Sequence, residues 1–479
     1  MARPARDLDR SRLLRRIPVR RRLPNGRRGG TLPAGPEEPA TSALTSGGPD
    51  QGRVFTVRFA SIVSTAALAI ALAPLPASAQ QPCTHTVGVV VELTGPAGRF
   101  GQAAAKSVEL AFKEINEAGG AAGCQLAADL RDSQSQGSVA VDQARQLVDL
   151  KRVPAIIGGI ISSVSLPILT SVTAPANVVQ ISPASSSPTL TRTAQEGKTN
   201  GIFFRTITSD ALQGTAAAKY AMDQGLKKIA VIHVNNDFGV NMVAEFKRAY
   251  EALGGQITSV TPYNQGQASY APEVTRGLEG DPPALYLVSY PGDGTAIART
   301  WISQGGAAKF LLNDGMNSAD FIRDVGPRYL NDAFGTSSGT TKTPSTEHFV
   351  KAYPAMSGGF DANAPAADRA YDAAAILGLA VAQAGKFEAA AIRDAIRKVT
   401  GSDGDVIYAG PEGFKKALQL IKDGKPVRYE GVIGPVSFDQ YGDITGPFRL
   451  WRIQNGEITT VGQMGVDEVN AIKAKIPSR

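Results

Sequence analysis

The chain has 479 residues and a formal net charge of +7. The positive charge lies in residues 1–58, where thirteen arginines against five acidic residues give about +8, so the rest of the chain carries about −1. This length exceeds one ordinary domain. Because residues 59–479 are nearly neutral, we exclude the class of proteins that bind nucleic acids through a basic surface, and we predict no nucleic-acid partner.

Residues 53–79 have the pattern of a secretory signal peptide. Arg53 and Arg58 precede an uncharged apolar stretch over 59–72, and Ala77-Ser78-Ala79 offers small residues for cleavage after Ala79. A membrane anchor is the alternative, but about 14 apolar residues are short for a span. We therefore predict export to the periplasm.

The preceding residues 1–52 are rich in arginine, proline and glycine, which predicts a disordered extension. Because a signal peptide normally begins a chain, we expect translation to start near Val54 or Val57. A real, unusually long n-region is the alternative.

The chain has two cysteines, Cys83 and Cys124, and each precedes a strand-like apolar run. The starts of neighbouring parallel strands lie side by side, and an oxidising compartment permits a bond between them. We predict a Cys83–Cys124 disulfide, with two unpaired thiols as the alternative.

After the leader, short apolar runs alternate with longer amphipathic ones, a pattern that predicts parallel sheets covered by helices. Strands are expected over 86–93, 126–132, 153–159, 178–182, 228–234, 257–263, 284–290 and 309–314, and hairpin-like strands over 431–461. Helices are expected over 100–120, 138–151, 165–177, 210–225, 239–255, 294–306, 366–385 and 389–399.

This order predicts an α/β protein with two doubly wound parallel-sheet lobes joined by crossing segments. We assign 80–207 and 332–435 to the first lobe, and 208–331 and 436–479 to the second.

Two apolar strands of the first lobe end in serine clusters. "IIGGIISSVS" carries Ser162 and Ser163 after two glycines, and "VVQISPASSS" carries Ser186. Ligands of open α/β sheets bind at the carboxyl ends of the strands. Glycines allow close approach of the backbone, and serine hydroxyls with helix N–H groups suit an anion such as a carboxylate.

No catalytic or metal-binding pattern stands out. The three histidines have no metal spacing, no Ser/His/Asp arrangement is evident, and "GPAGRFG" does not match the dinucleotide-binding fingerprint. We expect no enzyme activity, no cofactor and no metal.

Ordered stretches over about 83–461 resemble the periplasmic Leu/Ile/Val-type solute-binding proteins of ABC importers. They are "ELTGPAGRFGQ", "EINEAGG", "AIIGGIISSVSLP", "ISPASSSPTLT", "FFRTITSDALQGTAAAKY", "KIAVIHVNNDFG" and "GPVSFDQYGDITGP". The resemblance implies a type I periplasmic binding protein that closes its two lobes over a solute and delivers it to ABC permease subunits. We expect a monomer.

The resemblance also implies roles for individual residues. An amino-acid carboxylate would bind Ser162, Ser163, the backbone of Ala184 and Ser186, and the ammonium would bind Asp314. Aromatic walls would be Phe100, Phe238 and Tyr290, with Phe at two positions where Tyr is common.

Each of these residues also has a purely structural interpretation. The serines can cap helices, Asp314 and Tyr290 can belong to turns, and the two phenylalanines can lie in the core. An amino acid is the favoured ligand, because Asp314 would be left unpaired by a carboxylate without an ammonium. An aromatic carboxylate, an amide, a urea-like solute, or a sensing role are the alternatives.

Overall fold

The computed structural model describes residues 83–476, so the predicted extension over 1–52 and the signal peptide over 53–79 lie outside the described residues. The described part is an α/β protein with two main sheets, as the sequence predicts, and a small third sheet that was not predicted. The predicted Cys83–Cys124 disulfide is confirmed. Within 83–476 no single helix combines the length and apolar character of a membrane span, although helices α13 (Ala367–Ala384) and α14 (Ala389–Val399), bent by 110°, meet these criteria as a pair.

The first sheet is parallel throughout, in the order β2-β1-β3-β4-β5. Its central strands are buried on both faces over most of their length, as expected for a parallel sheet covered by helices, whereas the edge strand β2 is partly exposed. Its strands are β1 (Thr84–Val91), β2 (Gln125–Asp132), β3 (Ala155–Gly158), β4 (Val179–Ser182) and β5 (Phe203–Arg205).

The second sheet has the order β15-β14-β10-β9-β8-β6-β7. Its central strands are parallel, and an antiparallel hairpin of β14 and β15 is added at one edge. Its strands are β6 (Lys228–Val234), β7 (Gln256–Tyr263), β8 (Leu285–Val288), β9 (Phe310–Leu312), β10 (Phe334–Ser338), β14 (Phe448–Gln454) and β15 (Glu457–Met464).

The third sheet contains β11 (Asp405–Ile407), β12 (Val427–Gly431) and β13 (Gly434–Pro435). The expected hairpin region over 431–461 thus holds parts of two separate hairpins, β12–β13 and β14–β15.

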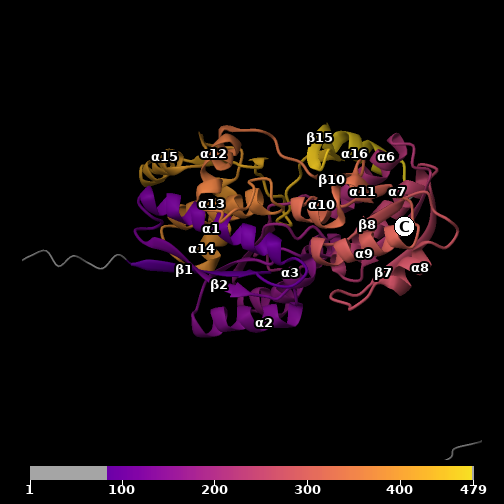
Figure 1. Cartoon of the computed structure of the whole chain (residues 1–479). Helices are drawn as coiled ribbons and strands as arrows, with labels where there is room; N and C mark the ends of the chain where they lie inside the picture. The colour runs from indigo at the N-terminus through magenta and orange to yellow at the C-terminus, as the bar shows by residue number, and fades with distance from the viewer. Residues whose placement is uncertain (1–82, 477–479) are drawn as a thin grey trace, which may run out of the picture. The chain divides into compact units, whose positions relative to one another are not determined.

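Helices pack on both main sheets, and α1 contacts α13 extensively although the two are far apart in sequence (Figure 1). Two π-helical turns, at 146–150 and 169–173, and one 3-10 turn, at 353–355, continue α-helices. The helices are α1 (Gly98–Glu117), α2 (Gly137–Arg145), α3 (Ser162–Ile168), α4 (Ala174–Ala176), α5 (Pro188–Gln195), α6 (Asp210–Asp223), α7 (Asp237–Ala252), α8 (Ala271–Gly277), α9 (Pro291–Ser303), α10 (Ala319–Val325), α11 (Pro327–Leu330), α12 (Pro344–Ala352), α13 (Ala367–Ala384), α14 (Ala389–Val399), α15 (Pro411–Lys422) and α16 (Val466–Lys473).

One predicted lobe boundary requires correction. β10 pairs with β9 and β14, so the second sheet extends to Ser338 rather than ending at residue 331. The sequence "FGTSS" conceals this strand because small and polar residues replace the usual apolar run. The loop over 436–447 contacts both main sheets: the carbonyl oxygen of Gly442 accepts a backbone hydrogen bond from Arg205 of the first sheet, and that of Pro447 accepts one from Gly339, which follows β10.

Candidate functional site

The two glycines before α3 are explained by packing within the first lobe. A Cβ on Gly158 would lie 1.9 Å from the carbonyl oxygen of Val90, and one on Gly159 would lie 2.3 Å from the side chain of Val164. Both positions therefore exclude larger residues. The expectation that these glycines serve close approach to a ligand is not needed to explain them.

Glu92 fixes the loop that follows these glycines. Its buried carboxyl oxygens accept hydrogen bonds from the backbone N–H groups of Ile160 and Ile161, at 3.0 and 3.2 Å. Burial raises the pKa of Glu92 to about 7, although the two N–H donors oppose the shift. Sequence analysis missed this residue; the available signal was an acid directly after a run of buried valines.

The opening turn of α3 places Ser162 on the cavity wall. Its hydroxyl oxygen accepts the N–H of Ser187 at 3.1 Å, which joins the two serine clusters. The hydroxyl proton stays available for a ligand, because the hydroxyl acts here as an acceptor. Ser165 instead lies in the core and donates to the carbonyl oxygen of Gly159 at 3.0 Å.

The second cluster presents backbone donors. Ala184 and Ser186 both line the cavity, and within the described residues 83–476 their backbone N–H groups have no protein acceptor. The Ser186 hydroxyl, however, donates to Asp210 at 2.8 Å. It is therefore engaged within the protein, and the N–H groups are the better carboxylate donors.

Arg205 stabilises the backbone of this second serine cluster from the protein interior. The side chain is fully buried, and its Nε donates to Asp443 at 2.7 Å. Its Nη1 donates to the carbonyl oxygens of Ser185 and Ser187, both at 3.0 Å. This arginine holds the backbone of the serine loop in place.

Asp314, the predicted ammonium ligand, lies shortly after β9 and opens a short 3-10 turn. Its Oδ1 accepts the N–H of Gly315 at 2.9 Å and the Asn313 side chain at 3.3 Å. Burial raises the pKa of Asp314, and these donors oppose the shift. Burial and the nearby Asp314 charge raise the pKa of Asp210 as well.

The predicted aromatic residues form an apolar wall. The rings of Phe238 and Tyr290 stack with centroids 5.7 Å apart, and Phe100 is 5% exposed. The Tyr290 hydroxyl accepts a hydrogen bond from Asn236 at 3.3 Å, which also donates to the Ser163 hydroxyl at 3.4 Å. Asn236 thus connects the two lobes beside the cavity.

A cavity of about 660 Å³ collects seven of the eight predicted ligand-binding residues. Ser163 is not part of its wall and contacts Asn236 instead. The seven that line the cavity are Phe100, Ser162, Ala184, Ser186, Phe238, Tyr290 and Asp314.

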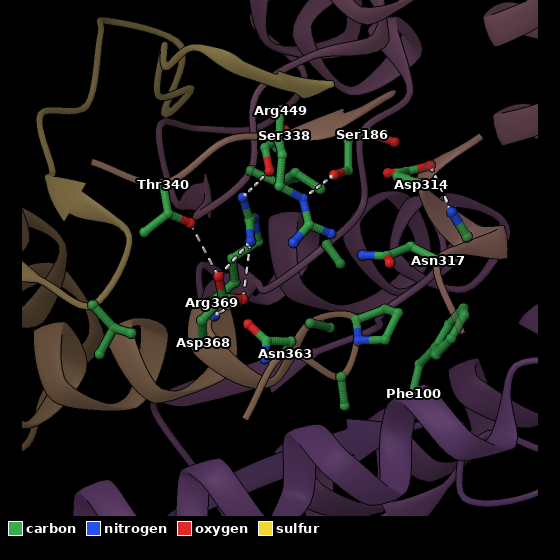
Figure 2. Close-up of a pocket in the computed structure, with 18 of the residues that line it drawn as sticks. Phe100, Ser186, Asp314, Asn317, Ser338, Thr340, Asn363, Asp368, Arg369 and Arg449 are labelled. Atoms are coloured by element: carbon green, nitrogen blue, oxygen red, sulfur yellow. Dashed lines mark hydrogen bonds and ion pairs between the residues drawn. The ribbon is translucent and has the colours of Figure 1, made fainter. Parts of the chain in front are cut away.

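Sequence analysis missed a second group of polar residues on this cavity. In Figure 2, Thr340, Asp368 and Arg369 lie on one side of the cavity, and Phe100 and Asp314 lie on the opposite side. The side chain of Arg449 lies between these two groups. These residues come from the β10–α12 loop, α13 and β14. No local motif marks them, because crossing segments bring distant parts of the sequence together.

The chain from residue 84 to residue 457 matches the family model described as "Periplasmic binding protein". A Leu/Ile/Val-binding protein homolog 3 of Brucella melitensis is 27% identical over 380 residues, covering 78% of this chain and 92% of the relative. The chemotactic signal transduction system substrate-binding protein BasB of Halobacterium salinarum is 27% identical, with coverage of 73% and 82%.

Solved structures agree with the fold. The leucine-binding protein LivK of Thermotoga maritima superposes with a TM-score of 0.68 at 23% identity, covering 80% of this chain and 99% of that one. The family model spans most of the chain, including the first sheet and every strand of the second sheet except β15. The chain therefore belongs to the periplasmic binding protein family.

Proposed function

We propose that this protein is a receptor that captures an α-amino acid in the cavity between its two main sheets and delivers it to an ABC importer. The observation that carries the proposal is the composition of the cavity wall. Neutral donors at Ser162, Ala184 and Ser186 suit a carboxylate, and the Asp314 carboxylate suits an ammonium. Relatives named Leu/Ile/Val-binding proteins support this ligand class.

Placing these partners on different sheets couples binding to closure. Ser162 begins α3 of the first lobe, and Asp314 follows β9 of the second. A ligand that engages both favours the closed arrangement over the open one. The closed form is then the signal that a permease recognises, so the protein needs no chemistry of its own and acts as a binding protein, not an enzyme.

The proposal includes export. The signal peptide over 53–79 is cleaved after Ala79, and the mature chain works in the periplasm as a monomer without a nucleic-acid partner. N-terminal sequencing of the mature protein tests the cleavage site.

An aromatic carboxylate is the second candidate ligand. The stacked Phe238–Tyr290 pair and Phe100 offer an apolar wall, and burial raises the pKa of Asp314, which lowers the cost of keeping it neutral. A sensing role is the alternative fate of the bound form, as the name of the BasB relative suggests.

A thermal-shift screen tests the ligand class. Residues 80–479 would be refolded to remove carried-over ligand and screened against L-amino acids and aromatic acids, because a ligand well above its Kd raises the Tm. Shifts with amino acids support the proposal. Shifts with aromatic acids alone would replace it by the second candidate.

A further inference from the structure

The side chain of Arg449 is a cationic group in the cavity wall that the proposed amino-acid site does not use. It comes from β14, and its Nε donates to the Ser337 hydroxyl at 3.3 Å. Throughout the described residues 83–476, no carboxylate lies within ion-pair distance of its guanidinium. Burial lowers the pKa of Arg449, in keeping with a guanidinium that has lost part of its water.

The neighbouring Arg369 differs because its charge is already balanced. Its Nη1 pairs with Asp368 at 2.7 Å, and its Nη2 donates to the carbonyl oxygens of Ser338 and Gly339. Thr340 adds a further contact to Asp368 at 3.5 Å. Asp368 pairs with Arg369 and attracts Arg449 only at longer range, so one acid faces two arginines and one positive charge is left over.

The position of Arg449 fits the far end of a bound amino acid. Figure 2 shows its guanidinium between the Arg369–Asp368 pair and the side of the cavity that holds Asp314 and Phe100. Thr341, Lys342 and Gln463 also line the cavity, so donors and positive charge lie beyond the groups assigned to the α-carboxylate and ammonium.

Closure would make an unmatched guanidinium costly, because a desolvated charge needs a partner. The planar fork of arginine matches a carboxylate through two parallel hydrogen bonds. The α-carboxylate is assigned to neutral donors and the ammonium to Asp314. The partner of Arg449 must then come from the ligand side chain.

We propose that the ligand carries a second anionic group and that Arg449 binds it, so the preferred solutes are α-amino acids with an acidic side chain. This inference rests on the proposed function and names the subclass of ligand. It assigns Arg449 as the residue that selects among amino acids.

The test compares L-glutamate with L-glutamine, which has nearly the same shape without the charge, by calorimetric titration of the refolded chain 80–479. We expect glutamate to bind at least tenfold more tightly. R449Q should weaken glutamate binding by about ten- to hundredfold and leave glutamine nearly unchanged. R449K keeps the charge without the fork and should retain part of the preference.

R452Q is the matched control, because Arg452 lies on the same strand, pairs with Asp332 at 3.5 Å, and does not line the cavity. It should leave both affinities unchanged, and circular dichroism melts establish that each variant is folded.

The possible failures are distinct. Equal or weaker binding of glutamate than of glutamine or L-leucine would overturn the inference and leave the amino-acid receptor intact. An equal loss of both ligands in R449Q would place the α-carboxylate on Arg449 and also overturn it. Absence of binding by any α-amino acid would overturn the proposed function itself.

Discussion

Arg205, which is fully buried behind the serine loop, and Arg449, which is partly buried in the cavity wall, differ in their partners. Arg205 has an aspartate, two carbonyl oxygens and the Thr191 hydroxyl around its guanidinium. Arg449 has one hydroxyl and an open cavity. The arginine whose guanidinium is fully paired within the protein stabilises the wall of the cavity. The arginine with few protein partners is exposed to a bound ligand.

The largest expected effect on folding comes from Arg205. Replacing it by methionine leaves the carboxylate of Asp443 without its cation, and removal of one member of a buried pair costs about 3–5 kcal/mol. R449Q should change the free energy of unfolding by less than about 1 kcal/mol. Urea unfolding monitored by circular dichroism measures both, and equal losses would remove the distinction between the two arginines.

Glu92 is a buried acid that, like Arg205, stabilises the backbone of the cavity wall. Its pKa is raised from 4.5 to about 7, so between these values the native state binds a proton that the unfolded state has lost. The stabilisation that Glu92 gives to the folded state is therefore fully present below about pH 4.5. As the pH rises through 7 it is lost, and the free energy of unfolding falls by up to about 3 kcal/mol.

The variant E92Q removes this titration and should flatten the dependence of unfolding free energy on pH between 5 and 8. Asp372, with a pKa also raised to about 7 by burial, contributes in the same direction and keeps part of the slope. An unchanged slope in E92Q would contradict the burial assigned to this carboxyl group.

Ser186 should act on stability more than on binding. Its hydroxyl supplies a hydrogen bond to the buried Asp210, and S186A leaves that carboxyl group short of a donor at a cost of about 1–3 kcal/mol. Urea unfolding measures the loss. The backbone N–H of residue 186 survives the substitution, so calorimetry should find ligand affinity nearly unchanged; a large loss of affinity without a loss of stability would reverse the assignment.

Ser162 should give the smallest effect, and on binding. Its hydroxyl proton is available to a ligand, and one such hydrogen bond contributes about 0.5–1.5 kcal/mol, so S162A should raise the Kd by about two- to tenfold in calorimetry. S165A is the control on the same helix, because Ser165 points into the core. An unchanged Kd in S162A would mean that this serine only joins the two clusters.

The contrast between side chains paired within the protein and side chains that line the cavity also explains what the sequence could predict. The alternation of strands and helices, the disulfide and the position of Ser162 at the end of a strand follow from local patterns, since ligands meet the ends of parallel strands. The positions of Asp314 and Tyr290 were expected only from the resemblance to the Leu/Ile/Val-type binding proteins. The engagement of Ser186 by Asp210 depends on a contact between β4's loop and α6, which no local pattern contains.

The two arginines on the other side of the cavity, Arg369 and Arg449, could not be predicted from the sequence either. Arg369 lies within an alanine-rich helix and Arg449 within a hairpin strand, and in sequence both look like ordinary surface charges. They reach the cavity because α13 and β14 follow crossings between the lobes. The misplaced boundary at 332 has the same origin, since β10 is recognisable only from its pairing with β9 and β14.

The central claim is that Asp314 binds the ammonium of an amino acid, and D314N tests it most directly. Calorimetry would compare an L-amino acid identified in the screen with its deaminated analogue, in the native protein, in D314N and in the control D324N, whose acid is exposed. The account predicts that D314N weakens the amino acid by at least about thirtyfold and leaves the analogue unchanged. Equal effects on both ligands, or none on either, would contradict it.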